Sequence, residues 1–528
     1  MKIVFVKHFK KSIKNKSNII NNTSSTHMSK KLNENVDWIK RELGNSSDIS
    51  INIGTVGNNQ DLHYASIYIH NLVDSSRINT LSMEISGILL SKSMISHDYF
   101  DIVKNTLSSF RKAQEGSDYN TLIDNLLSGG TVFLLDGNDK FFSIYSGATE
   151  GRTVGEPSSQ TVIKGPKEGF VERIDINIAL IRKRIKNKDL RVEQLVLGTV
   201  SHTQIALMYI DKIAEKEIVD EIKNRLYKIK IDNLAESNYI EELIKDDRYT
   251  FFPTFFNSER PDAIAAGLIE GRIAILVDGT PFVITAPTVM AEFFQASEDY
   301  YNNFTVSSFI RLIRLICFFL ALLVPALYIA LITFNQEVIP TSLLISIAAQ
   351  REGLPFPAFI EALLMELTFE VLREAGVRMP RVIGPTVSIV GGLVLGQAAV
   401  EAGIVSAVMV VLVSITAIAS LAISNYAMSN AVRLLRFFLM ILATVLGLYG
   451  VFMGMILILL HLCKLKSIGV PYLTPFAPKI KGGYKDTLIR SPLWSNKLRP
   501  AGISAVNSSR VDENNPVNPN QKEEPEFR

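Results

Sequence analysis

The sequence predicts an α/β cytoplasmic region of two similar tandem subdomains, followed by an all-α transmembrane helical bundle. Residues 1–308 have the composition of an ordinary globular chain, whereas residues 310–463 are mostly Leu, Ile, Val, Ala, Phe and Gly. The mean hydropathy of +0.21 averages over this split. Within the first part, a unit of helix, glycine, strand and Asp-Gly turn occurs twice, 142 residues apart. The apolar part indicates a bilayer-spanning region, and the constant offset indicates a duplicated folding unit.

Length, charge and cysteine content limit the class of protein. A chain of 528 residues has room for three or four domains. The formal net charge of +3 gives no sign of a nucleic-acid partner. The two cysteines, Cys317 and Cys463, lie in or beside apolar segments, which argues against a disulfide framework.

The N-terminal segment is basic. Residues 1–31 hold eight lysines and no acidic residue. Their apolar run, Ile3 to Val6, is shorter than the roughly 7–15 residues of a secretory signal core. We expect residues 1–35 to be a basic disordered leader, which either has no role of its own or touches anionic lipid as a mobile arm.

Two stretches of the soluble part have matching patterns. The matching pairs are helices 121–127 and 263–269, Gly129 and Gly271, strands 131–136 and 273–278, and turns Asp136-Gly137 and Asp278-Gly279. Asp-Gly favours tight β-hairpin turns. We expect one α/β subdomain at 36–146, a linker rich in Gly, Ser, Thr and Pro at 147–164, and a second α/β subdomain at 165–308. Chance recurrence of a common unit is the alternative.

No catalytic constellation is found in the sequence. It has no phosphate-binding Gly-rich loop, no H-E-x-x-H and no C-x-x-C. Asp136 and Asp278 are explained by their turns, and Glu259-Arg260-Pro261-Asp262 by helix capping and local ion pairing. We therefore expect no enzyme activity, no cofactor and no metal.

The membrane region is expected at 309–463. Its apolar or amphipathic segments are 310–334, 338–350 (short), 358–375 (amphipathic), 383–400, 403–424 and 437–462. The first segment is long enough to span a bilayer of roughly 30 Å. Its only charges, Arg311 and Arg314, stand at its start and place that end, with the soluble region, in the cytoplasm.

The segment 358–375 is too charged to face lipid on all sides. Glu366, Glu370 and Arg373 recur at i, i+4 and i+7 and share one helix face. In a symmetric oligomer this face would line a polar or ion path, with one carboxylate ring per position. Alternatively, Glu370 pairs with Arg373, or Glu366 pairs with an arginine on a neighbouring helix.

Small residues and basic groups bear on packing and topology. Gly392, Gly396, Gly450 and Gly454 have the spacing that lets helix backbones approach closely. If every basic group flanking the apolar segments is cytoplasmic, 437–462 must re-enter rather than cross. Four to six spans fit the sequence; we favour both termini in the cytoplasm, with 358–375 not fully crossing. Residues 464–528 are expected to be a polar cytoplasmic tail, disordered toward its end.

A set of short motifs resembles a known family. The motifs are Gly165-Pro-Lys-Glu-Gly-Phe170, Leu180-Ile-Arg-Lys-Arg184, Ser258-Glu-Arg-Pro-Asp262, Asp278-Gly-Thr-Pro281, Glu370 to Pro380, Gly391 to Val400 and Gly469-Val-Pro-Tyr-Leu473. Over about residues 36–500 the chain resembles the A subunit of GerA-type spore germination receptors of endospore-forming Bacillus-like bacteria. The family more often has Thr at Ser258. The resemblance singles out Glu259, Arg260, Pro261, Asp262, Asp278, Gly279 and Pro281 as motif positions.

The resemblance implies a receptor of three kinds of subunit in the spore inner membrane. A transporter-like B subunit holds the nutrient, and a lipoprotein C subunit lies on the outer face. The A subunit oligomerises and couples nutrient detection to ion release, as the conducting or signalling subunit. A component of a secondary transporter for a small solute is the alternative, although 310–463 lacks the internal repeat common in transporters.

Overall fold

The computed structural model describes residues 27–56, 62–74, 76–80, 83, 113–147, 155–379, 384–480, 483–500, 502–503, 507 and 509–510, with the backbone alone at 384–391 and 393. Most of the leader, linker positions 148–154 and the end of the tail lie outside these residues. The chain divides into two units, Met1–Gly151 with Lys186–Lys188, and Arg152–Ile185 with Asp189–Arg528. Each unit is described by itself.

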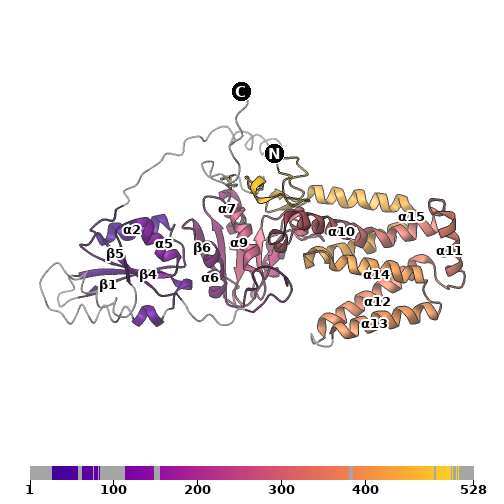
Figure 1. The fold of residues 1–528 in the computed structure, drawn as a ribbon, viewed down its shortest axis with the longest axis horizontal. Helices are drawn as coiled ribbons and strands as arrows, with labels where there is room; N and C mark the ends of the chain where they lie inside the picture. Colours follow the sequence, from indigo (N-terminus) through magenta and orange to yellow (C-terminus); the bar gives the residue numbers. More distant parts are fainter. Residues whose placement is uncertain are drawn as a thin grey trace, which may run out of the picture. The chain divides into compact units, whose positions relative to one another are not determined.

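The first unit contains a five-stranded antiparallel sheet. Its strand order is β1-β2-β4-β5-β3. The strands are β1 (Ile49–Val56), β2 (Leu62–Ile69), β3 (Ala113–Gly116), β4 (Gly130–Leu135) and β5 (Phe141–Tyr145), and helices α2 (Leu32–Glu42) and α5 (Tyr119–Leu127) lie on one side of the sheet (Figure 1). Helix α2 begins inside the expected leader because Leu32 and Val36 are buried. The sequence did not predict β1.

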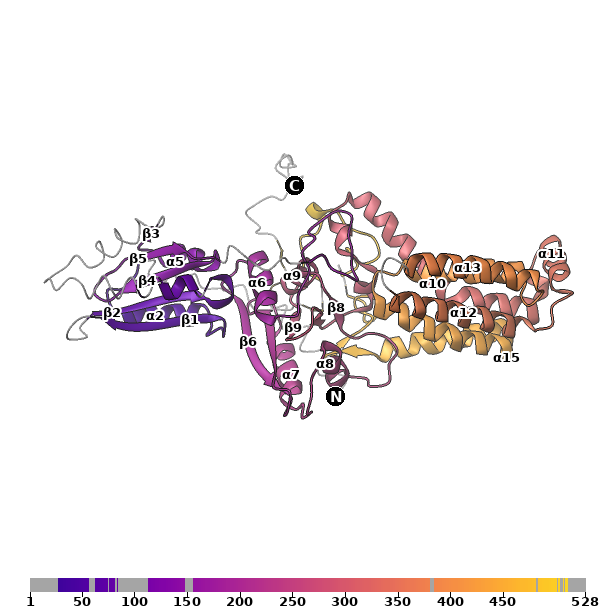
Figure 2. The ribbon, with the colours of Figure 1, turned by 90° about the horizontal axis from the view of Figure 1, so that it is seen from below.

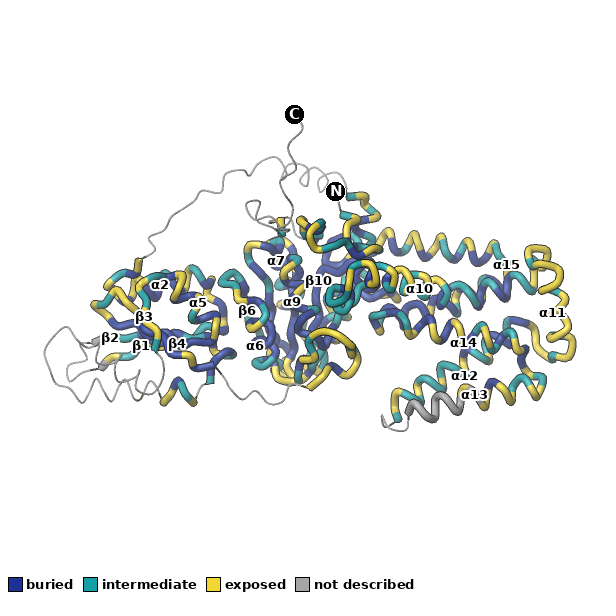
Figure 3. Tube along the Cα trace, viewed as in Figure 1, coloured by how far each residue is buried: buried dark blue, intermediate teal, exposed yellow. Residues whose placement is uncertain are grey.

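The second unit begins with a sheet of the same design. Its order is β6-β7-β9-β10-β8, which repeats the order of the first sheet strand for strand. The strands are β6 (Leu190–Leu197), β7 (Thr203–Ile210), β8 (Phe256–Ser258), β9 (Ile273–Val277) and β10 (Val283–Ala286), and the helices are α6 (Ile174–Arg184), α7 (Lys216–Tyr227), α8 (Ser237–Ile244) and α9 (Pro261–Ile269). Its strands are largely buried (Figure 3).

Helices cover both faces of this second sheet. Side chains alternate along a strand, so Ile273 and Ile275 of β9 pack with α7 and α8. Ala274 and Leu276 of the same strand pack with α6 and α9. The unit is therefore a three-layer α/β/α arrangement with an apolar core on each side of the sheet.

The two Asp-Gly turns occupy equivalent places in the two sheets. Asp136 Oδ1 accepts a hydrogen bond from the backbone N of Leu32 at 2.9 Å. Asp278 Oδ1 accepts one from the backbone N of Ile174 at 3.1 Å. Both turn glycines have positive φ, 85° at Gly137 and 92° at Gly279, which glycine adopts at no steric cost. Each aspartate thus ties its hairpin to the first helix of its own sheet.

The helical region follows the second sheet. Its helices are α10 (Phe304–Thr333), α11 (Thr341–Arg351), α12 (Ala358–Arg378), α13 (Gly384–Glu401), α14 (Ala407–Leu421) and α15 (Tyr426–Lys464). Helices α10, α12, α13, α14 and α15 lie side by side, and α11 lies at one end of them (Figures 1 and 2). Among the described residues, α10 and α15 are long and apolar enough to cross a membrane. Five of the six helices begin and end within about six residues of an expected segment. Helix α15 ends close to its expected segment but begins at Tyr426, well before residue 437.

Helix α15 consists of two antiparallel halves that meet at Gly447. This glycine has φ 61° and ψ −142°, far from helical values. A Cβ built on Gly454 would lie 2.5 Å from Cδ2 of Leu439, although the two positions would be roughly 22 Å apart along one straight helix. A Cβ on Gly447 would lie 2.8 Å from Cβ of Phe334, just beyond α10. The second half therefore returns toward the end of the bundle where α10 begins.

The chain after α15 packs against the second sheet, which corrects the expectation of a simple polar tail. The short strands β11 (Lys466–Ser467) and β12 (Val470–Pro471) pair with each other. Ile468 and Val470 belong to the apolar core under α7 and α8, and Tyr472 is fully buried. The described tail residues are thus part of the folded second unit.

Candidate functional site

Helix α12 carries a buried carboxylate that faces an arginine of α15. Both oxygens of Glu366 accept hydrogen bonds from Nη1 of Arg436, at 2.7 and 2.6 Å. Neither side chain is exposed to any extent. Thr416 of α14 donates to Glu366 at 3.3 Å. Three helices therefore meet at this pair.

The next carboxylate of α12 is paired as well. Glu370 Oε2 accepts from Nη1 of Arg433 at 2.6 Å, and Nη2 of Arg436 lies 3.9 Å from its other oxygen. The guanidinium of Arg373 stacks 5.4 Å from the ring centre of Tyr426, a cation–π distance. Glu370 thus pairs across to α15, whereas the predicted pairing with Arg373 within α12 is not the one observed.

A third carboxylate of α12 was not singled out from the sequence. Glu361 is fully buried and accepts from the backbone N of Ser406 at 2.6 Å and from the Ser406 hydroxyl. Nη2 of Arg351, at the end of α11, lies 3.8 Å from its other oxygen. Glu361, Glu366 and Glu370 therefore all face arginines of other helices. For Glu361, the signal available in the sequence was its partner Arg351, a charge that interrupts an apolar run.

The glycines predicted to pack helices behave differently from one another. Gly454 and Gly450 lie where the two halves of α15 approach, beside Leu439 and the Leu442 carbonyl. A Cβ on Gly396 would lie 3.4 Å from Val410 of α14, an ordinary contact. One on Gly392 would meet no described atom within 4 Å. Close backbone approach within this chain thus involves Gly450 and Gly454.

The motif Glu259-Arg260-Pro261-Asp262 joins β8 to α9 and anchors the segment expected to be a free linker. The Glu259 carboxylate accepts from the backbone N of Ser158 at 2.6 Å and from the Ser159 hydroxyl at 2.9 Å. The Arg260 guanidinium donates to the carbonyl of Pro166 at 3.0 Å. Pro261 occupies the first helical position of α9, where its missing N–H costs nothing.

Within this motif, Arg260 and Asp262 form a buried ion pair 2.8 Å long. Asp262 also accepts a hydrogen bond from the Tyr301 hydroxyl at 2.5 Å. Burial and this hydrogen bond raise the pKa of Tyr301 to about 12. Because Tyr301 lies three residues before the first residue of α10, the motif connects the second sheet to the start of that helix.

A second polar cluster surrounds the start of α10. Asp299 lies 3.2 Å from Nε of Arg311 and 2.8 Å from Nη1 of Arg314. Arg311 also pairs with Asp486 of the C-terminal segment at 3.1 Å, and Tyr300 donates to Asp486 at 2.9 Å. Burial raises the pKa of Asp486, and the charge of Arg311 opposes that rise. Arg311 and Arg314, which served as topology signals in the sequence, therefore also hold this polar cluster together.

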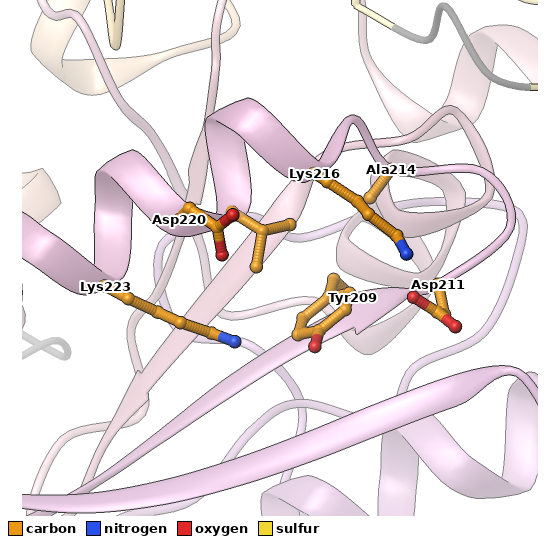
Figure 4. A pocket seen from close by; sticks show the side chains of 7 residues that line it. Tyr209, Asp211, Ala214, Lys216, Asp220 and Lys223 are labelled. Carbon is orange, nitrogen blue, oxygen red and sulfur yellow. The ribbon is translucent and has the colours of Figure 1, made fainter. Parts of the chain in front are cut away.

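A hollow between β7 and α7 offers little to a ligand (Figure 4). It is lined by Tyr209, Asp211, Ala214, Lys216, Val219, Asp220 and Lys223. Its volume of 170 Å³ is below the roughly 300 Å³ at which small-molecule sites begin. Lys223 and the Tyr209 hydroxyl already contact Glu193, at 2.8 and 2.5 Å. The ion-paired face of α12 is the stronger candidate.

Comparison with known proteins identifies the family. The family described as Bacillus/Clostridium GerA spore germination protein matches residues 37–502. Spore germination protein KA of Bacillus subtilis (strain 168) is 45% identical over 485 residues, 92% of this chain and 88% of that protein. YfkQ of the same strain, described as an uncharacterized membrane protein, is 42% identical over 444 residues, 84% of this chain and 86% of that protein.

One solved structure is also similar to this chain. The N-terminal domain of the A subunit of the Bacillus megaterium spore germinant receptor GerK3 is 34% identical, spans 51% of this chain and 98% of its own length, and has a TM-score of 0.41. By the match over residues 37–502 and the identity to whole-length relatives, this chain belongs to the GerA family of spore germination proteins.

Proposed function

We propose that this chain is the A subunit of a spore germinant receptor and couples nutrient detection to ion release across the spore inner membrane. In this proposal it assembles with copies of itself, with a transporter-like B subunit and with a lipoprotein C subunit. The observation that carries the proposal is similarity to spore germination proteins along nearly the whole chain. In this proposal the chain has no catalytic role.

The fold of the bundle supports a topology with both ends in the cytoplasm. The turn at Gly447 sends the second half of α15 back, so that Lys464 ends near the level at which α10 enters the bundle. Arg433, in the first half, and Arg314, in α10, lie toward that same end. Basic residues collected on one side are what the positive-inside rule expects of the cytoplasmic face.

The paired face of α12 supports a role in the ion path. Carboxylates within a bilayer are costly unless they are paired or face water. Here Glu366 and Glu370 are held by Arg436 and Arg433 of α15. In an oligomer, movement of α12 relative to α15 would release these carboxylates, and rings of carboxylates attract cations. The observed pairing is then the closed arrangement.

A strain that lacks this chain tests the proposed role. Spores of that strain should no longer release ions in response to at least one nutrient, whereas a germination trigger that bypasses receptors should still act. Restoring the chain on its own should restore the response. Unchanged ion release for every nutrient that the parent strain detects would refute the role.

A further inference from the structure

An exposed apolar patch lies on α8 and the loop that follows it, near the C-terminal end of α15. The patch consists of Tyr239 and Leu243 on α8 with Tyr249 and Phe251 in the loop that follows. Tyr249 is 91% exposed and Phe251 is 59% exposed. Tyr239 and Leu243 are four residues apart and share one face of α8. We propose that this patch is a bilayer anchor, inserting its side chains among lipid headgroups on the cytoplasmic side.

The position of the loop along the bundle supports this assignment. The hydroxyl of Thr250 lies 2.9 Å from Nε2 of His461, in the last turn of α15. Just before His461, Leu459 and Leu460 are exposed on the bundle surface, and Lys464 ends the helix. The apolar surface therefore stops at this turn, which places the edge of the hydrocarbon layer there.

The neighbours of Thr250 must lie at nearly the same depth. Consecutive Cα atoms are about 3.8 Å apart, so Tyr249 and Phe251 are within one residue of the contact with His461. The ring of Phe252 stacks on His461 at 6.2 Å between centroids and is buried. Phe252 and Thr250 thus fix the loop to α15, while Tyr249 and Phe251 are left with exposed rings.

The chemistry of the patch fits lipid headgroups. Aromatic side chains, Tyr above all, are enriched at membrane–water interfaces because they have an apolar body and a polar tip. Arg248, Lys464 and Lys466 are exposed around the patch and provide positive charge for lipid phosphates.

The two aspartates in the same loop are already occupied. Asp246 pairs with Arg225 at 2.7 Å and accepts from the backbone N of Gly469 at 2.9 Å, and Asp247 accepts from the backbone N of Tyr249 at 3.1 Å.

The anchor is part of the sheet's own core. On α8, Ile240 and Ile244 are buried among the side chains that cover the second sheet. Lipid contact at Tyr239 and Leu243 would therefore hold the whole second sheet against the bilayer. This inference rests on the proposed membrane position of α15, so its test must separate the two.

Tryptophan fluorescence in liposomes tests the anchor on the full-length chain. In a background with Trp38→Phe and Trp494→Phe, single Tyr249→Trp and Phe251→Trp variants report on the loop. Lipids brominated near the headgroup end of the acyl chain should reduce their emission to about half or less of the value in unbrominated lipid. The matched control is Val196→Trp, because Val196 is 57% exposed on β6, an edge strand of the sheet, and should keep its emission.

A second control separates the anchor from the membrane assignment. Phe452→Trp reports on the surface of α15, where Phe452 is 73% exposed. Quenching at Phe452→Trp without quenching at either loop position overturns the anchor alone. A blue shift of the loop probes that appears only when partner subunits are added, without quenching, assigns the patch to protein and also overturns it. Absence of quenching at Phe452→Trp overturns the membrane position itself and the anchor with it.

Discussion

Nη1 of Arg436 on α15 donates to both carboxylate oxygens of Glu366 on α12, and neither side chain of this ion pair is exposed. A buried pair of this kind is costly to desolvate, and removing one partner leaves an uncompensated charge. The pair therefore makes the packing of α12 against α15 sensitive to the loss of either partner.

Substituting Glu366→Gln should lower the level and thermal midpoint of the assembled subunit. Arg436 loses its nearest counter-charge and keeps Glu370 only at 3.9 Å, and breaking a buried pair in this way costs about 3–5 kcal/mol. The double variant Glu366→Gln with Arg436→Gln should recover part of that loss. The matched control is Glu374→Gln, since the Glu374–Arg378 pair is exposed and such pairs contribute little. An unchanged level and thermal midpoint in Glu366→Gln would contradict a structural role of this ion pair.

Substituting Tyr301→Phe should lower the thermal midpoint of the full chain in detergent. The variant removes the hydrogen bond to Asp262, worth about 1.5–3 kcal/mol for a charged acceptor, and loosens the link between α9 and α10. Tyr227→Phe serves as control because Tyr227 is 68% exposed on α7. Equal midpoints for both variants would contradict the proposed link.

Glu241 should make stability depend on pH. Burial raises the pKa of Glu241 to about 7, with a smaller contribution from Glu236 and with Lys245 opposing. Between pH 4.5 and 7 the folded chain therefore holds a proton that the unfolded chain has lost, so this group's contribution to stability falls as pH rises through that window and is level above it. When thermal midpoints are measured from pH 4 to 8, this fall should be absent in Glu241→Gln. Glu242→Gln, at an exposed neighbour, should keep it, and parallel profiles for all three proteins would refute the assignment.

The turn at Gly447 predicts from which side of the membrane a thiol reagent can label Cys463. In a Cys317→Ala background, an impermeant thiol reagent should reach Cys463, which is exposed, only from the side that holds the soluble region. Gly447→Ala should weaken the turn, because its φ of 61° disfavours a Cβ and that Cβ would meet Phe334. Labelling of Cys463 from the outer side alone would mean that α15 crosses without turning back.

Local patterns made much of the fold predictable. The Asp-Gly turns, the glycines that end α5 and α9, and the strands between them follow from short-range turn and helix rules, and the repeat doubles that signal. The apolar segments follow from composition. The hydrogen bond from Leu32 to Asp136 could not be predicted, because it joins residues 104 positions apart.

The site was only partly predictable for the same reason. The spacing of Glu366, Glu370 and Arg373 predicts a shared polar face, but the choice of Arg436 and Arg433 as partners depends on how α15 packs. Ser158 and Ser159 look like linker residues until the fold brings them to Glu259. The flanking basic residues raised the possibility that 437–462 turns back, but the position of the turn at Gly447 could not be predicted, because glycine is common in membrane helices and the sequence pattern does not show its φ.

Coupling of a nutrient signal to ion release by this chain can be measured as ionic current across liposomes. Liposomes would hold the complete receptor, or the receptor without this chain, with an ion gradient imposed. We expect a downhill current that begins on nutrient addition, needs this chain and is not tied to a fixed solute stoichiometry. Nutrient uptake coupled to ion movement at a fixed ratio, or a current that persists without this chain, would contradict it.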